Sequence, residues 1–301
     1  MYKYFALLLI ASSLYLQSCD EDFFSQVVEV ELPEHQSLPA IFSEMQAGDS
    51  FLSVLVSNSK SILEADTAYQ LPEDAVVNLY QNDALLTTLN FDTDTKQYTA
   101  MLPTPLSGQT SNAFRLEVSV PGFETVEAIQ QMPQQPRITN AVYELEGTID
   151  TEGYRVDEIT VDIEDTTPNQ VNYYGINVYQ HIIELDNNGD TLYQYINQLY
   201  LDSNDPLLSY GDKYSFIFSD EGFTDGKYQL RAFSSYRAES DENIEVHLHQ
   251  LTRDAFLYYR SKDQYYNALD NPFAEPVTVH TNIAGGYGIF SLSNVLVYPL
   301  E

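Results

Sequence analysis

Three side chains in one alternating segment could together bind a metal ion. Glu245, His247 and His249 are spaced two residues apart in a run that alternates polar and apolar residues. Residues two apart in a β-strand point to the same face of a sheet, so the carboxylate and both imidazoles would be neighbours. Such groups are ligands for zinc or copper. An exposed polar sheet face explains the same pattern, and His181 and His280 are too distant in sequence for their spacing to complete the set.

A second candidate cation site lies in a predicted turn. Asp186, Asn188 and Asp190 place side-chain oxygens at alternate positions, as calcium-binding loops do. Position twelve of such a loop is Asn197 and not the glutamate that completes an EF-hand. Asn188-Gly189 between two alternating runs also predicts a type I′ hairpin turn, which explains the same residues without an ion. Calcium binding and a plain hairpin turn are therefore both open.

Glycines flank an aromatic residue near the end of the chain. Gly285 and Gly286 precede Tyr287, and Gly288 follows it. Glycine permits positive φ angles and close backbone approach. The segment could therefore present Tyr287 to a ligand, or it could form a tight turn that inserts the last strand, expected at 289–298. We favour the structural interpretation.

The common catalytic motifs are missing from the sequence. It contains no Gly-x-Ser-x-Gly, no phosphate loop, no dinucleotide fingerprint and no His-Glu-x-x-His. Carboxylates are so numerous that no single pair can be selected for glycoside hydrolysis. The sequence therefore predicts a protein that is not an enzyme.

The elements that must position these residues are mostly β-strands. Residues 27–132 contain six or seven short alternating runs separated by polar turns, including 27–32 and 113–120. They predict an antiparallel β-sandwich, whose later half resembles immunoglobulin-like or transthyretin-like modules. Residues 133–136 include two prolines and predict an extended linker. Residues 137–301 predict a second antiparallel β domain with longer strands.

One late segment departs from the strand pattern. Residues 252–269 contain no glycine or proline and begin at Thr252, a suitable N-cap. Apolar and aromatic residues recur on one side at helical spacing, whereas Lys262 falls mostly elsewhere. We expect one amphipathic helix packed on the second sheet. The residues on its packed side are Phe256, Tyr259, Tyr266 and Leu269.

Charge and cysteine content exclude several classes of partner and bond. The chain has 45 acidic and 13 basic residues, a net charge of −32. Nucleic acids and anionic lipid headgroups would be repelled, so neither is an expected partner. Apolar residues make up 44% of the chain, which is enough for packed cores. Cys19 is the only cysteine, so no internal disulfide can form.

Residues 1–18 predict a signal peptide. Residues 5–16 form a mostly apolar run that is too short to span a hydrocarbon layer of about 30 Å. The run ends in Leu16-Gln17-Ser18-Cys19, which resembles a bacterial lipobox. The resemblance implies that Cys19 is acylated, starts the mature chain and anchors it to a membrane. An ordinary secretory signal is the alternative.

Residues 19–26 predict an acidic tether. Asp20, Glu21 and Asp22 follow the cysteine directly. They resemble the export signal of Bacteroidota surface lipoproteins, which implies a cell-surface position on the outer membrane. The alternative is a solvated tether that faces the periplasm.

The segment after the predicted helix carries a family resemblance. It runs Asn271-Pro272-Phe273-Ala274-Glu275-Pro276 and, after Val277 to His280, continues Thr281-Asn282-Ile283-Ala284-Gly285-Gly286-Tyr287-Gly288-Ile289-Phe290. This block resembles the end of a Bacteroidota lipoprotein family known as domain of unknown function family 4249. With the lipidated start, the β-sandwich and the late helix, the resemblance covers most of the chain. It implies an outer-membrane lipoprotein encoded, in many members, near TonB-dependent transporters, and it transfers no catalytic residues.

These observations predict a non-enzymatic outer-membrane lipoprotein, an accessory or ligand-capturing subunit of a TonB-dependent uptake system. A surface glycan or peptide hydrolase and a cation-binding lipoprotein are the alternatives. The expected partners are the membrane, through Cys19, and a TonB-dependent transporter. No cofactor is expected beyond the covalent lipid, unless zinc or calcium occupies one of the candidate sites.

Overall fold

The structure is a computed structural model. It describes residues 35–61, 71–186, 188, 190–212, 214–234, 243–269 and 273–300. Residues Ser37–Glu301 form one compact unit, which is the unit described below. The predicted signal peptide, Cys19, the acidic tether, the strand expected at 27–32 and Asn271-Pro272 lie outside the described residues.

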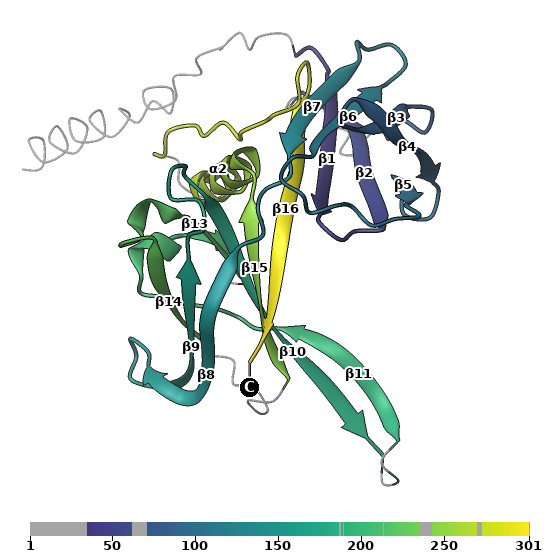
Figure 1. The fold of residues 1–301 in the computed structure, drawn as a ribbon. Helices are drawn as coiled ribbons and strands as arrows, with labels where there is room; N and C mark the ends of the chain where they lie inside the picture. The colour runs from purple at the N-terminus through teal and green to yellow at the C-terminus, as the bar shows by residue number, and fades with distance from the viewer. Residues whose placement is uncertain are drawn as a thin grey trace, which may run out of the picture. The chain divides into compact units, whose positions relative to one another are not determined.

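The strands of the first half and the last described strand surround one hydrophobic core (Figure 1). Their order is β16-β1-β2-β5-β4-β3-β6-β7. Strand β4 pairs with two neighbours at different points along its length, through residues 84–89 with β3 and through residues 90–92 with β5. Alternate side chains point inward, including Val54, Leu79 and Phe114, which are fully buried. The strands are β1 (Pro39–Gln46), β2 (Phe51–Asn58), β3 (Val76–Gln81), β4 (Ala84–Asp92), β5 (Gln97–Met101), β6 (Ala113–Ser119), β7 (Val126–Gln131) and β16 (Tyr287–Pro299).

The second half packs a three-stranded sheet against a larger one. The small sheet has the order β14-β9-β8, and the facing strands have the order β12-β13-β10-β15-β16, with β11 paired to β10. Side chains such as Ile159, Ile176 and Val246 fill the second core between them. The elements are β8 (Arg137–Ile149), β9 (Arg155–Glu164), β10 (Tyr173–Leu185), β11 (Thr191–Gln198), η3 (Pro206–Leu208), β12 (Tyr210–Asp212), β13 (Ser215–Ser219), η4 (Asp220–Gly222), β14 (Lys227–Ser234) and β15 (Ile244–Leu251).

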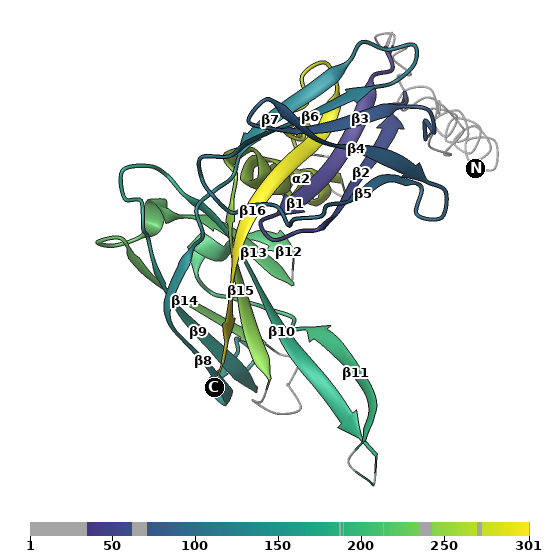
Figure 2. The same ribbon diagram turned by 45° about the vertical axis from the view of Figure 1, so that its right-hand side comes forward.

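The last strand connects the two cores. β16 pairs in parallel with β1 and antiparallel with β15. Phe290 and Leu292 are buried in the first core, whereas Leu296 and Tyr298 pack against the second. The predicted linker at 133–136 lies between β7 and β8, and β16 contributes side chains to both cores (Figures 1 and 2).

The late helix lies where the sequence predicts it. Helix α2 (Arg253–Leu269) follows β15, and the backbone N–H of Ala255 donates to Thr252 Oγ1 at 3.4 Å, as expected of an N-cap. Phe256 is buried and stacks on Tyr173 at 4.8 Å between ring centroids. Tyr173 alternates with the core-facing residues of β10, so α2 covers the sheet face opposite the second core. The mainly β fold with one late helix is confirmed for the part of the chain that the structure describes.

Among those described residues, no helix is long and apolar enough to cross a membrane.

Candidate functional site

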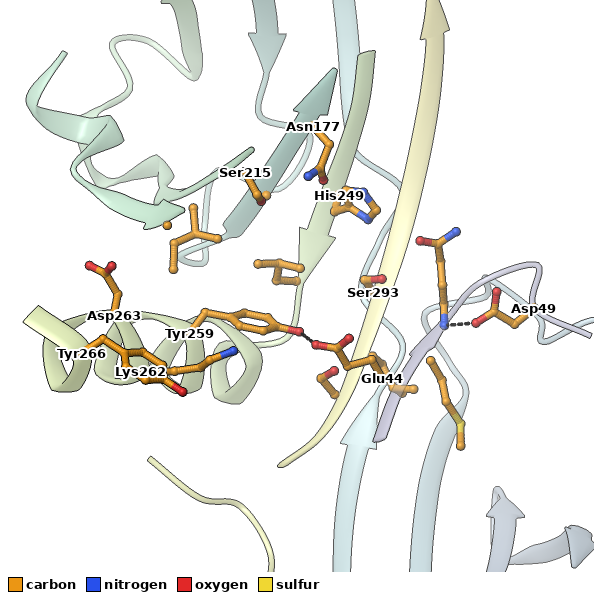
Figure 3. A pocket seen from close by; sticks show the side chains of 18 residues that line it. Glu44, Asp49, Asn177, Ser215, His249, Tyr259, Lys262, Asp263, Tyr266 and Ser293 are labelled. Atoms are coloured by element: carbon orange, nitrogen blue, oxygen red, sulfur yellow. Dashed lines mark hydrogen bonds between the residues drawn. The ribbon is translucent and has the colours of Figure 1, made fainter. Parts of the chain in front are cut away.

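A groove of about 660 Å³ lies between α2 and the sheet that it covers (Figure 3). Beneath the middle of α2, several helix-facing positions of the strands carry small or polar side chains, beside the apolar Ile217 and Leu251. Because these side chains fill less space than the Phe256–Tyr173 stack nearer the start of the helix, they leave a cavity. They include Gly175, Asn177, Ser215, Ser291 and Ser293.

One wall of the groove is a stripe along α2. Tyr259, Lys262, Asp263 and Tyr266 occupy positions i, i+3, i+4 and i+7, which face the same side of a helix. The sequence analysis placed Lys262 mostly elsewhere, but its side chain lines the groove beside both tyrosines (Figure 3). The wall therefore combines two aromatic rings with one positive and one negative charge.

The opposite wall is acidic. Glu44 of β1 accepts a hydrogen bond from the Tyr259 hydroxyl. Burial in the groove raises the pKa of the Glu44 carboxyl, and the positive charge of Lys262 opposes this rise. More than a third of Glu44 still reaches solvent, so its desolvation is partial. Burial also raises the pKa of Asp49, although the carboxylate accepts a hydrogen bond from the Gln46 backbone N–H at 2.7 Å.

The floor of the groove is the sheet surface beneath α2, and it includes a neutral histidine, His249. Burial lowers the pKa of His249 to about 4, and the nearby His247 adds to this effect. His249 is therefore uncharged at neutral pH and offers one ring nitrogen as a hydrogen-bond acceptor. It faces the groove near Asn177 and Ser215 (Figure 3).

The predicted zinc or copper ligands do not all meet. Glu245 Oε1 lies 2.6 Å from His247 Nε2 and 2.9 Å from His181 Nε2, whereas His249 faces the groove. Sequence spacing did not reveal His181, which reaches Glu245 because Tyr179 of β10 pairs with Glu245 of β15. Nowhere in the described ranges are three His, Cys, Asp or Glu side chains arranged to hold a metal ion. Metal binding here stays a prediction.

His280, the other histidine set aside in the sequence, lies elsewhere. Its Nε2 is 2.8 Å from Asp254 Oδ1 at the start of α2, and Gln130 Nε2 donates to the other carboxylate oxygen at 2.7 Å. These bonds tie β7 and the segment before β16 to the helix.

The predicted calcium residues lie in the turn of the β10–β11 hairpin. Asp186 Oδ1 accepts hydrogen bonds from the backbone N–H groups of Asn188 at 2.8 Å and Asp190 at 2.9 Å. These bonds explain the side-chain pattern as a turn. Calcium binding at this turn stays a prediction.

The glycine segment brings β16 against β1. Gly288 has φ +101°, and a Cβ atom there would lie 1.8 Å from the Ile41 carbonyl oxygen. A Cβ atom on Gly286 would lie 2.6 Å from the Pro39 carbonyl oxygen. This close approach supports the structural interpretation of the segment. A ligand-binding role for the half-exposed Tyr287 stays a prediction.

Residues 26–298 match the protein family described as "Domain of unknown function (DUF4249)". The chain belongs to this family. The match covers the first core, the second core except Leu300, α2 and all residues that line the groove, so it agrees with the resemblance seen in residues 271–290. The DUF4249 description assigns no activity, ligand or partner. The comparison with curated proteins returned no match.

Proposed function

We propose that this DUF4249 protein is an outer-membrane-anchored lipoprotein that captures a small ligand in the groove between α2 and the sheet. It would act as an accessory or ligand-capturing subunit of a TonB-dependent uptake system. The observation that carries the proposal is the groove itself. Its volume of about 660 Å³ lies within the range of small-molecule sites, and polar side chains converge on it from five strands and one helix.

The groove favours binding over hydrolysis. An acid–base pair needs two titratable groups whose surroundings push their pKa values apart. Here burial raises the pKa of both Glu44 and Asp49, so this carboxyl pair lacks that separation, and burial lowers the pKa of His249 to about 4, which leaves its imidazole a weak base. The Asp49 carboxylate also holds the turn after β1 through the Gln46 N–H. We therefore propose a non-enzymatic role in preference to a surface hydrolase.

The membrane anchor in this proposal rests on the sequence. The lipobox-like segment ending at Cys19 and the following acids support a lipid anchor and a cell-surface position. Replacing Cys19 by Ala should move the protein from the membrane to the soluble fraction and abolish labelling by a palmitate analogue. Ser12→Ala within the apolar segment is the matched control. Retention of label in the Cys19 variant would contradict the anchor.

A projecting hairpin supports the accessory-subunit part. β10 and β11 extend past the neighbouring strands as a two-stranded arm (Figures 1 and 2). Five large side chains on this arm are between 46% and 64% exposed, which suits contact with a transporter. They are Ile183, Leu192, Tyr193, Tyr195 and Ile196.

Copurification tests this partnership. Tagged protein isolated from its native membrane in mild detergent should carry a transporter in fixed ratio. Leu192→Ser combined with Ile196→Ser should reduce that ratio, whereas Met101→Ser, at an exposed site on β5, should not. A protein that always purifies alone would contradict the accessory role and leave ligand capture to be tested separately.

Ligand capture is tested by filling the groove. Ser293→Phe places a ring in the cavity, and Val76→Phe adds the same ring at an exposed site on β3. A small molecule that raises the melting temperature of the native protein and of Val76→Phe, but not of Ser293→Phe, would support the proposal. Equal responses of all three proteins would contradict a site in the groove.

A further inference from the structure

We infer that the ligand of this groove is a small organic cation bearing an alkylammonium or guanidinium group. The inference rests on the proposed ligand capture and specifies its chemistry.

The charges that line the groove do not balance. Among the described residues that line the groove, three carboxylates, Glu44, Asp49 and Asp263, accompany one ammonium group, Lys262, so their formal charges sum to −2. His249 adds no charge at neutral pH, because burial lowers its pKa to about 4. Carboxylates that are withdrawn from water gain from a positive partner. Burial raises the pKa of Glu44 and Asp49, so a positive charge placed beside either carboxylate would stabilise its ionised form.

The helix wall offers aromatic faces beside these acids. Tyr259 and Tyr266 project from α2 into the space that Glu44 and Asp263 border (Figure 3). A cation over a tyrosine ring is attracted by the negative face of the ring. The chain uses this contact elsewhere, since the Arg260 guanidinium lies 4.6 Å from the centroid of the Tyr210 ring. Acids and rings together therefore select for a cation.

The floor can accept hydrogen bonds from ammonium or guanidinium N–H groups. The Ser291 and Ser293 hydroxyls, the Asn177 amide oxygen and a ring nitrogen of neutral His249 are all acceptors. An anionic ligand would meet the three acids of the groove within a chain of net charge −32, which repels anions and attracts cations.

The size of the space favours an organic cation over a bare metal ion. A volume of about 660 Å³ holds a molecule of many atoms. The part of the chain that the structure describes has no cluster of three His, Cys, Asp or Glu side chains positioned around one ion. A polyamine, or the basic side chain of a short peptide, fits this combination.

Isothermal titration calorimetry on the full-length lipoprotein in detergent tests the inference with four probes. Spermidine and argininamide are the cations, maltotriose is neutral and citrate is anionic. We expect at least one cation to bind with 1:1 stoichiometry, and maltotriose and citrate not to bind. The affinity for the cation should fall as NaCl is raised from 50 to 500 mM, because the Debye screening length shortens from roughly 14 to roughly 4 Å.

Charge-removing variants locate the binding. Glu44→Gln combined with Asp263→Asn should weaken cation binding at least tenfold. Glu152→Gln, which removes one acid from the exposed β8–β9 turn, should leave it unchanged. Equal cation affinity in the double variant and the native protein would overturn the inference, because it would assign binding to the general surface charge.

The remaining outcomes separate the two proposals. Binding of maltotriose or citrate that Ser293→Phe abolishes, without cation binding, would overturn the cation inference and leave ligand capture intact. If no probe binds, the cation inference fails. If, in addition, no small molecule distinguishes Ser293→Phe from Val76→Phe in the melting assay, the proposed ligand capture fails as well.

Discussion

Gly288→Ala should strongly destabilise the protein, because β16 approaches β1 too closely for a Cβ atom. Such an atom would lie 1.8 Å from the carbonyl oxygen and 2.8 Å from the carbonyl carbon of Ile41. Both are backbone atoms of the paired strand β1, so no side-chain rotation can relieve the collision. The two strands must separate at a point where Phe290 and Leu292 are buried in the first core.

Gly48→Ala is the control that separates the cost of a positive φ angle from the cost of the steric collision. Gly48 has φ +94°, close to the +101° of Gly288, but no atom lies within 4 Å of the Cβ position. Its substitution should therefore cost only the conformational penalty of a positive φ, about 1–2 kcal/mol. Gly288→Ala carries the same penalty and also disturbs the β1–β16 pairing. We expect it to lower the free energy of unfolding by more than about 4 kcal/mol.

Urea unfolding followed by circular dichroism measures both variants. Thermal unfolding provides a second measurement, because a loss of 1 kcal/mol in the free energy of unfolding lowers the melting temperature of a protein of this size by about 2–4 °C. If Gly288→Ala is too unstable to purify, Gly286→Ala provides an intermediate case, since its Cβ atom would lie 2.6 Å from the Pro39 carbonyl oxygen. Equal losses for Gly288→Ala and Gly48→Ala would refute the close approach of the two strands.

Three further predictions concern α2 and the sheet beneath it. Phe256→Ala should lower the free energy of unfolding by about 3–5 kcal/mol in urea titrations, because it leaves a cavity at a buried site. Tyr266→Ala is the control and should cost much less, since Tyr266 is 59% exposed. Similar losses for the two variants would contradict the packing of α2. Thr252→Ala should cost about 0.5–1 kcal/mol by removing the N-cap, and no loss would contradict that role. The lowered pKa of His249 should make the free energy of unfolding fall as pH drops from about 6.5 towards about 4. In this range the imidazole binds a proton in the unfolded chain but stays neutral in the folded protein. The loss is at most about 3–4 kcal/mol, 2.5 pH units at about 1.4 kcal/mol each, and His249→Asn should flatten this slope between pH 7 and 4.5.

Local periodicity predicted the clearest elements. The run at 113–120 becomes β6 (Ala113–Ser119), and the helix expected at 252–269 becomes α2 (Arg253–Leu269). In both cases the spacing of apolar residues matches the geometry of one element, so the sequence of that element carries the signal. The most specific part of the family resemblance was also local, the contiguous block at 271–290, and the family match extends over residues 26–298.

The groove could not be found in this way. Glu44, Ser215 and Lys262 are separated by tens to more than a hundred residues, and each is an ordinary polar residue in its own element. His181 shows the same difficulty, because strand pairing alone brings it to 2.9 Å from Glu245. A run of small polar residues at alternate strand positions was the one available hint of a cavity.

The sequence by itself determined the β-rich composition, the late helix and the acidic charge, because each depends on neighbouring residues or on totals. The lipid anchor at Cys19 stays a prediction from the sequence. Only the tertiary structure decided that the last strand pairs with the first described one and that α2 lies over a floor of small polar side chains. Strand order and cavities depend on contacts between residues distant in the chain. No local pattern records which of those contacts form.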